Sequence, residues 1–377
     1  MTSPRGGPRI VVAPDKFKGS LTAAQAAEAI AEGLRRSCPD ANVIQLPVAD
    51  GGDGTVEAAV AAGYQRQMVT VCGPTGEAVQ ATFALRGGTA VLEMAQASGL
   101  RQLPGGRLAP LTATTYGTGE LLKAALDAGC QHLVLGVGGS ATTDGGAGMA
   151  QALGAQLLDV DGAELPPGGA ALADLDRIDT TGLDPRLAST TVVIASDVDN
   201  PLVGARGAAH VYGPQKGATP SEVLLLDAAL TRYADIVERD LGVSVAHRRG
   251  AGAAGGTGAG AIAFLGAHST SGIVLILDVV GFADAVSGAD LVITGEGCLD
   301  AQSLSGKAPV GVARAAASAG VPVIALVGRL EVADDELRGV GITSAHAILE
   351  LQPDDVLAKR DAAMLLGRLA EKLGANL

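Results

Sequence analysis

Glycines and hydroxyl side chains are concentrated between Gly136 and Gly146, directly after a short apolar run, Leu133 to Leu135. Glycine at this density lets backbone N–H groups face an anion, because no Cβ stands in the way and a positive φ costs little. A helical pattern follows, and its N-terminus would add the positive end of a helix dipole. The alternative is a tight turn between a buried strand and a buried helix. The abundance of glycine and polar side chains favours phosphate binding, which we assign to Gly138, Gly139, Ser140, Thr142, Thr143, Gly145 and Gly146.

Polar loops also end four other apparent strands, at residues 14–20, 49–55, 196–201 and 294–300. Carboxylates, lysines and glycine loops are the groups that Mg²⁺-dependent phosphoryl transfer uses. The predicted Mg²⁺ ligands are Asp50, Asp53 and Asp144. For Asp50 and Asp53, capping of the helix after Thr55 is an equal alternative. The loops and their neighbours also supply Asp15, Asp197, Asp199, Asp300, Lys16, Lys18, Lys216 and Lys307.

Known nucleotide-binding signatures are missing from these loops. Gly306-Lys307 is followed by Ala308, so there is no Walker A motif, and the protein-kinase motifs are absent. The run from Gly136 to Ala141 ends in alanine where the dinucleotide fingerprint has glycine. These loops therefore do not belong to the common nucleotide-binding classes.

Composition restricts the class of protein further. The net charge of −13 argues against a nucleic-acid partner, which requires a basic face. The four cysteines are scattered, which suits a reducing cytoplasm, and no pair of histidines has metal-type spacing. The start of the sequence has no long apolar segment, and the charge-free stretch from Gly250 to Leu277 is predicted to form a glycine loop, a buried helix and a strand. We therefore expect a soluble, cytoplasmic protein without a membrane partner.

The order of elements indicates an α/β fold. A buried strand, Arg9 to Ala13, precedes a helix over Ala23 to Arg36 that Thr22 caps, and a strand over Val43 to Val48 follows. Strand–loop–helix units in succession predict a parallel sheet with ligands at its carboxyl edge. Antiparallel patterns begin near Val69, and the parallel pattern returns at Asp290. We predict a discontinuous, doubly wound domain at 1–70 and 285–377, with a second α/β domain inserted at 71–284.

Several long motifs, in order, resemble the type-1 glycerate kinase family. They are APDKFKGSLTA at 13–23, PVADGGDGT at 47–55, GTGELL at 117–122, GVGGSATTDGGAGMAQALGA at 136–155, SDVDNPLVG at 196–204, YGPQKGA at 212–218, GAGAAGGTGAG at 250–260 and DLVITGEGCLDAQSLSGKAPVGVA at 290–313. The chain departs from the family pattern at Lys16, where serine is common, and at Asp53, where glutamate is common. The resemblance extends from about residue 9 to about residue 330.

The resemblance implies ATP- and Mg²⁺-dependent phosphorylation of D-glycerate to 2-phosphoglycerate, in glyoxylate, glucarate or serine-linked carbon metabolism. It also implies a Rossmann-like domain with an inserted α/β domain and a site in the cleft between them. A kinase for another small hydroxy acid and a non-catalytic metabolite-binding protein are the alternatives, and homo-oligomerisation stays open.

Individual residues have predicted roles in this kinase reaction. Asp197 is the predicted catalytic base, with metal ligation or a turn role as alternatives. Lys18 and Asp300 are the other predicted catalytic residues, and Lys18 is expected to contact a phosphate or the glycerate carboxylate. The predicted substrate-binding set is Lys16, Lys18, Ser20, Asp50 and Asn200, and Lys216, Gly255 and Gly256 complete the nucleotide-binding set.

Overall fold

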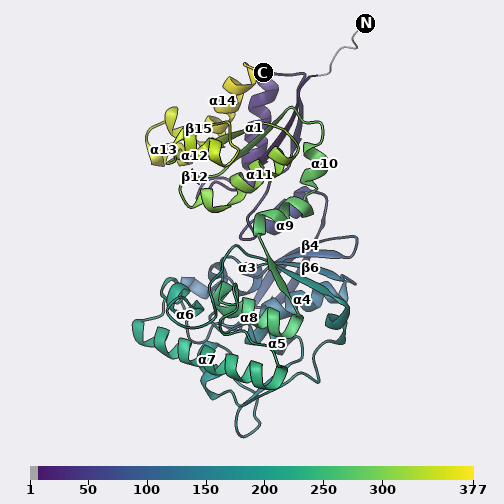
Figure 1. Cartoon of the computed structure of the whole chain (residues 1–377), viewed down its shortest axis with the longest axis vertical. Helices are drawn as coiled ribbons and strands as arrows, with labels where there is room; N and C mark the ends of the chain where they lie inside the picture. The colour runs from purple at the N-terminus through teal and green to yellow at the C-terminus, as the bar shows by residue number, and fades with distance from the viewer. Residues whose placement is uncertain (1–6) are drawn as a thin grey trace. The chain divides into compact units, whose positions relative to one another are not determined.

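The computed structural model describes residues 7–377, which form two compact units (Figure 1). Unit 1 takes the chain up to Asp50 together with Glu57–Gly63 and Ile273–Leu377, and unit 2 takes Gly51–Val56 and Tyr64–Gly272. The predicted boundaries at 70 and 285 differ from this division for two reasons. Strand β3 (Gln65–Cys72) pairs with β4 of unit 2, and Ile273 contacts Gly311 of unit 1.

Unit 1 is built on a five-stranded sheet in the order β15-β13-β11-β1-β2, and all neighbouring strands run parallel. Counted along unit 1, the strands lie in the order fifth, fourth, third, first, second. This is a doubly wound order whose switch point lies between β1 and β11, where ligands bind in such sheets. The strands are β1 (Arg9–Pro14), β2 (Asn42–Gln45), β11 (Leu291–Gly295), β13 (Val323–Val327) and β15 (Ser344–Ala347).

Helices α1 and α14 pack side by side in unit 1 (Figure 1). A Cβ at Gly33 of α1 would overlap the backbone of Gly367 of α14, so glycine permits this close approach. Thr22 caps α1 in a capping box, as its sequence predicts. The sequence from Asp354 to Leu373 predicts a single C-terminal helix, but the structure has two helices, which meet at Asp361. The helices of unit 1 are α1 (Ala23–Ser37), α9 (Gly272–Val279), α10 (Phe282–Val286), α11 (Ala308–Ser318), α12 (Asp334–Gly339), α13 (Asp355–Arg360) and α14 (Ala362–Gly374), and α2 (Thr55–Ala61) begins in unit 2.

Unit 2 contains a six-stranded mixed sheet in the order β10-β9-β6-β5-β4-β3. Strands β3, β4 and β5 are antiparallel, which confirms the pattern predicted from Val69 onward, and β5, β6, β9 and β10 are parallel. The core is almost entirely aliphatic, in keeping with an aromatic content of only 2%. The strands of this sheet are β3, β4 (Ala78–Arg86), β5 (Thr89–Glu93), β6 (His132–Gly136), β9 (Thr191–Ala195) and β10 (His268–Thr270).

The helices of unit 2 cover this sheet and carry the glycine-rich loops. They are α3 (Ala95–Ser98), α4 (Tyr116–Asp127), α5 (Ala147–Ala152), α6 (Ala208–Tyr212), α7 (Pro220–Leu241) and α8 (Ala253–Leu265). The charge-free stretch from Gly250 folds as α8 and β10, but the apolar run from Ile273 is helical, in α9. Among the residues described, no helix is long and apolar enough to cross a bilayer.

Candidate active site

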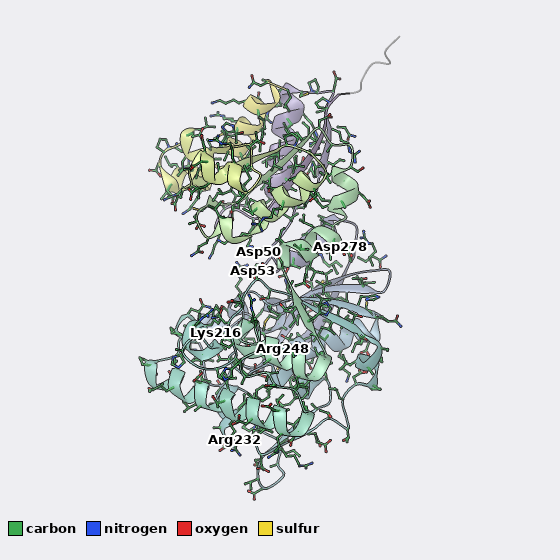
Figure 2. The ribbon with its side chains drawn as sticks, viewed as in Figure 1. Asp50, Asp53, Lys216, Arg232, Arg248 and Asp278 are labelled. Atoms are coloured by element: carbon green, nitrogen blue, oxygen red, sulfur yellow. The ribbon has the colours of Figure 1, made fainter. Side chains whose placement is uncertain are left out.

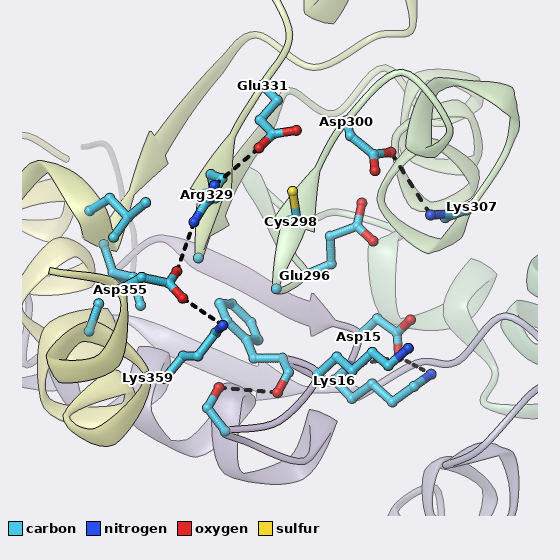
Figure 3. Close-up of a pocket in the computed structure, with 18 of the residues that line it drawn as sticks. Asp15, Lys16, Glu296, Cys298, Asp300, Lys307, Arg329, Glu331, Asp355 and Lys359 are labelled. Carbon is cyan, nitrogen blue, oxygen red and sulfur yellow. Dashed lines mark hydrogen bonds and ion pairs between the residues drawn. The ribbon is translucent and has the colours of Figure 1, made fainter. Parts of the chain in front are cut away.

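A pocket of about 520 Å³ opens in unit 1 at the carboxyl ends of its strands (Figure 3). Asp15 directly follows β1, and Glu296 directly follows β11. Because Pro14 and Gly295 are paired in register, these two acidic residues leave neighbouring strands at the same level. The pocket therefore lies at the switch point of the sheet, the position that fold geometry favours for a ligand.

Both of these carboxylates are buried: Asp15 is 6% exposed and Glu296 is 8% exposed. Burial raises the pKa of Asp15 to about 6, against the opposing charge of Lys16, whose ammonium lies 3.6 Å away. Burial also raises the pKa of Glu296 to about 7. Its Oε1 is buried and has no hydrogen-bond partner among the described residues. A buried carboxylate oxygen without a partner is costly, and such groups are concentrated at functional sites.

Cationic side chains surround this acidic pair. Lys16 also lies 3.9 Å from Asp50, and Lys18 is exposed at the pocket. Lys307 lies 3.9 Å from Asp300 on the other side of Glu296 (Figure 3). Four of the residues predicted from strand ends in unit 1, Lys16, Lys18, Asp50 and Asp300, thus line one pocket together with Ser20. A pocket with both signs of charge suits a small anion that carries hydroxyl groups.

The opposite end of the pocket carries a second charged group (Figure 3). Arg329 begins β14 (Arg329–Leu330), which pairs with β12 (Cys298–Leu299). Its guanidinium lies 2.9 Å from Asp355, and Asp355 also pairs with Lys359 at 2.6 Å. These side chains are partly exposed, so the ion pairs add little stability. They add further charged side chains to the lining of the pocket.

Unit 2 presents the glycine-rich loop that follows β6. Only Gly138 and Gly139 of the predicted phosphate-binding set are accessible, and every residue from Ser140 to Ala150 is buried. The loop at 51–54 packs against this accessible part, because a Cβ at Gly138 would lie 2.7 Å from Gly52 Cα. A Cβ at Gly51 would likewise lie 2.7 Å from the carbonyl oxygen of Ala195, at the end of β9. Two glycine loops and the end of β9 therefore meet at one edge of the sheet in unit 2.

Asp144 occupies the position where the sequence predicted an anion or a metal. Its carboxylate accepts hydrogen bonds from the amides of Thr115, Gly146 and Gly148 and from the Thr115 hydroxyl, at 2.8–3.3 Å. The amide of Gly145 bonds to the carbonyl of Gly255. Helix α5 has only six residues, and Asp144 already satisfies its first amides. The Asp144 carboxylate is therefore engaged within its own loop and by Thr115, and its role as a Mg²⁺ ligand stays a prediction.

Lys216, labelled in Figure 2, is also internal, with an exposure of 1%. Its ammonium donates to the carbonyl of Thr142, and a Cβ at Gly255 would lie 2.8 Å from Nζ. Burial lowers the pKa of Lys216 to about 7, against the charge of Asp144. Lys216 therefore holds the loop at 142 beside Gly255, and its contact with nucleotide stays a prediction.

Three other predicted residues have mixed outcomes. Asp53 is ion-paired with Arg101 at 3.1 Å, and Asp197 is exposed, two residues beyond the end of β9. Asn200 donates to the carbonyl of Arg206 and accepts from the Tyr212 hydroxyl, both at 2.8 Å. Both ends of the Asn200 amide are thus engaged within the loop, so the structure does not support its predicted contact with substrate.

Comparison with known proteins shows the family of the chain. The sequence model described as the glycerate kinase family matches residues 10–377. The chain belongs to the glycerate kinase family. The glycerate kinase of Halalkalibacterium halodurans is 49% identical over 94% of this chain and 95% of its own length. The glycerate 2-kinase of Escherichia coli is 47% identical over 90% of this chain and 88% of its own.

A solved structure shows the same fold. The glycerate kinase 2 structure from Salmonella typhimurium LT2 superposes with a TM-score of 0.87 and 45% identity, covering 98% of both chains. The predicted α/β class is confirmed, and the chain is an enzyme of the kinase class. The family match includes the last fifty residues, where the motifs recognised in the sequence are sparse.

Sequence reasoning did not foresee the burial of two carboxylates of this kinase. Glu93, which is 4% exposed, ends β5 and accepts the amides of Gly54 and Val56 at 3.1 and 2.7 Å. It thereby caps α2 and holds the glycine loop at 51–54 in place. Glu296 was a candidate base or metal ligand with a solvent-facing position as the alternative, and the structure buries it in the pocket. In each case the acidic residue directly follows or ends an apolar strand, and this was the available signal.

Titration of Glu296 should be visible in the stability of the metal-free protein. Below pH 4.5 the carboxyl is protonated in both states, whereas between about 4.5 and 7 only the unfolded chain releases the proton. The folded state is therefore progressively disfavoured as the pH rises through this window. In EDTA, the free energy of unfolding of Glu296→Gln should rise relative to that of the wild type by on the order of 2–3 kcal/mol between pH 5 and pH 8. Urea unfolding measures this difference. Glu331→Gln, at an exposed position, is the control and should show no such rise. A difference between Glu296→Gln and the wild type that does not change with pH would refute the raised pKa of Glu296.

Proposed function

We propose that this enzyme transfers the γ-phosphoryl group of ATP to the 2-hydroxyl of D-glycerate in a Mg²⁺-dependent reaction. The observation that carries the proposal is the pocket of unit 1, in which Lys16, Lys18 and Lys307 surround two buried carboxylates at the switch point of the sheet. A three-carbon hydroxy acid offers an anion for the lysines and hydroxyl groups for the carboxylates. The names of the family and of its relatives supply the identity of the acid.

Residues within each unit, taken separately, have proposed roles in this reaction. Lys16, Lys18 and Ser20 line the pocket of unit 1 and would bind the carboxylate of the acceptor. The accessible glycines of unit 2, Gly138 and Gly139, with the packed loop at 51–54, would receive phosphate oxygens through backbone N–H groups. Asp197 leaves the same sheet edge of unit 2 and is the proposed base.

Asp300 has a supporting role in this proposal. It accepts the Ser303 amide at 2.9 Å and lies 3.9 Å from Lys307. The bond from the Ser303 amide and the charge of Lys307 keep the pKa of Asp300 below its usual range, so it remains ionised. An ionised Asp300 holds the loop that presents Lys307 to the pocket. We therefore place Asp300 as a positioning residue and not as a proton acceptor.

The direct test supplies ATP labelled at the γ-phosphate to the purified protein, with a panel of small hydroxy acids. Labelled phosphoglycerate should form from D-glycerate, and chelation of Mg²⁺ should stop the reaction because phosphoryl transfer depends on metal-bridged phosphates. If another hydroxy acid is phosphorylated and glycerate is not, glycerate is not the substrate. Full activity in EDTA would remove the metal from the mechanism.

The position of transfer can be read with one coupling enzyme. If the product is 2-phosphoglycerate, enolase alone should convert it to phosphoenolpyruvate. A signal that appears only after phosphoglycerate mutase is added would identify the 3-isomer and contradict the proposal. The four cysteines have no disulfide partners, which supports a reducing, cytoplasmic setting for this reaction.

A further inference from the structure

The carboxylates that the sequence offered as Mg²⁺ ligands are engaged elsewhere. Asp144 is saturated by four hydrogen-bond donors, and Asp53 is ion-paired with Arg101 at 3.1 Å. Asp50 is partly exposed and lies 3.9 Å from the Lys16 ammonium. Among the described residues, no group of three or more metal-binding side chains forms a ready cage. A kinase needs no such cage, because Mg²⁺ keeps several waters and is held by one or two carboxylates together with phosphate oxygens.

The pocket of unit 1 contains a pair with the required properties. Asp15 and Glu296 follow the paired ends of β1 and β11, and the amide of Asp15 bonds to the carbonyl of Gly295 at 2.8 Å. The amide and the ammonium of Lys16 each lie near Oδ1 of Asp15. Glu296 is more than nine-tenths buried, lines the pocket, and leaves Oε1 without a partner among the described residues. An orphaned carboxylate oxygen inside an acidic pair is the feature that a cation would satisfy.

We propose that Asp15 and Glu296 are the carboxylate ligands of the divalent cation at the switch point of unit 1. This inference rests on the proposed Mg²⁺-dependent reaction and deepens it. Hard oxygen ligands match Mg²⁺ and Mn²⁺, and the absence of histidine and cysteine from the pair disfavours zinc. When bound, the cation would supply charge neutralisation to phosphate oxygens.

The surrounding charges fit a site that fills together with an anion. Lys16 lies on the Asp15 side, and Lys307 and Asp300 lie on the Glu296 side (Figure 3). The mutual repulsion of Asp15 and Glu296 contributes to the raised pKa of Glu296, after burial as the main cause. A bound cation would relieve this repulsion. The lysines would then face the anion that shares the cation, and they would not compete for the carboxylates.

Direct metal binding tests the proposal without turnover. The full-length protein, free of nucleotide, is titrated with Mn²⁺, and free Mn²⁺ is followed by electron paramagnetic resonance. The wild type should bind one equivalent. Glu296→Gln and Asp15→Asn should each weaken Mn²⁺ binding by roughly 10-fold or more, because each removes one of two charged ligands. Asp53→Asn is the matched control, since the sequence predicted Asp53 as a Mg²⁺ ligand but the structure pairs it with Arg101, and it should bind Mn²⁺ within about 2-fold of the wild type.

The outcomes separate this proposal from the proposed function. Wild-type Mn²⁺ affinity in both pocket variants, or loss of binding in Asp53→Asn, would overturn the assignment. A wild type that phosphorylates glycerate but binds no Mn²⁺ without nucleotide would also overturn it and leave the function standing. A wild type that binds Mn²⁺ through this pair but turns over no hydroxy acid would support the site and refute the function. If circular dichroism shows that Glu296→Gln is unfolded, Asp15→Asn decides the question.

Discussion

Asp197→Asn should lower kcat for glycerate phosphorylation by about 10²- to 10⁴-fold, the usual contribution of a positioned base. Asp197 stands two residues beyond β9, at the sheet edge where Gly51 packs on Ala195. Asparagine keeps the shape of the side chain but cannot accept the proton of the attacking hydroxyl. The affinity for ATP should barely change, because the phosphate contacts are assigned to the backbone of the glycine loops. Initial rates at saturating glycerate and equilibrium nucleotide binding measure the two effects separately.

Titration of the Asp197→Asn variant with Mg²⁺ distinguishes the remaining roles. If Asp197 were a metal ligand, the variant would need much more Mg²⁺, and added metal would restore part of the rate. A near-normal kcat at ordinary Mg²⁺ would leave Asp197 as a turn residue only. Asp199→Asn is the control in the same loop, because its carboxylate pairs with Arg206 at 3.4 Å and Arg249 at 3.5 Å at the surface. Exposed ion pairs contribute little, so this control should retain the wild-type rate.

Gly255→Ala should both destabilise unit 2 and weaken nucleotide binding. Gly255 has a φ of +72°, and a Cβ there would overlap the carbonyl oxygen of Thr142 and lie 2.8 Å from the Lys216 ammonium. The methyl group would push apart the two buried loops that Lys216 joins. Overpacking of this kind and the left-handed backbone together cost roughly 2–4 kcal/mol. Urea unfolding gives the stability, and calorimetric titration with ATP should show an affinity reduced by about 10-fold or more, the cost of a displaced loop.

A second glycine at the other end of the same helix isolates the steric contribution. Gly266 has a φ of +61°, and a Cβ there would meet nothing within 4 Å. Gly266→Ala should therefore lower the free energy of unfolding by only about 1 kcal/mol, the cost of alanine in a left-handed backbone conformation. The affinity for ATP should be unchanged. Equal losses of stability in the two variants would show that the contact between Gly255 and Thr142 does not matter. Normal ATP binding by a destabilised Gly255→Ala would separate the buried loops from the nucleotide site.

Local sequence patterns predicted most of the secondary structure. The buried run from Arg9 and the capping residue Thr22 were sufficient for β1 and α1, because strand burial and helix capping depend on neighbouring residues. The break at Asp361 between α13 and α14 was missed, since the apolar periodicity continues through it. The position of the boundary near residue 64 was also missed, because β3 belongs to unit 2 only through its pairing with β4.

Residue types alone could not distinguish the side chains that form hydrogen bonds within the protein from those that face a ligand. Asp144 and Asn200 have the chemistry of metal and substrate contacts, but their polar atoms are used by backbone amides, carbonyls and a tyrosine hydroxyl within unit 2. Lys216 has the charge for a phosphate, but it is buried against the Thr142 carbonyl. Only the folded chain reveals these partners, because Thr115 and Thr142 lie far in sequence from Asp144 and Lys216 and the nearer partners depend on the path of each loop.

The sequence by itself determined the fold class, the family and the loops in which the chemistry is concentrated. Strand-end glycines, hydroxyls and carboxylates are properties of contiguous segments, so they can be recognised without a structure. The tertiary structure decided which carboxylates remain unsatisfied. Asp15 and Glu296 are 281 residues apart in the sequence, and parallel pairing of β1 with β11 brings them to one level of the sheet. Burial then raises the pKa of each and leaves one Glu296 oxygen without a partner, and these properties depend on the surrounding chain rather than on either residue alone.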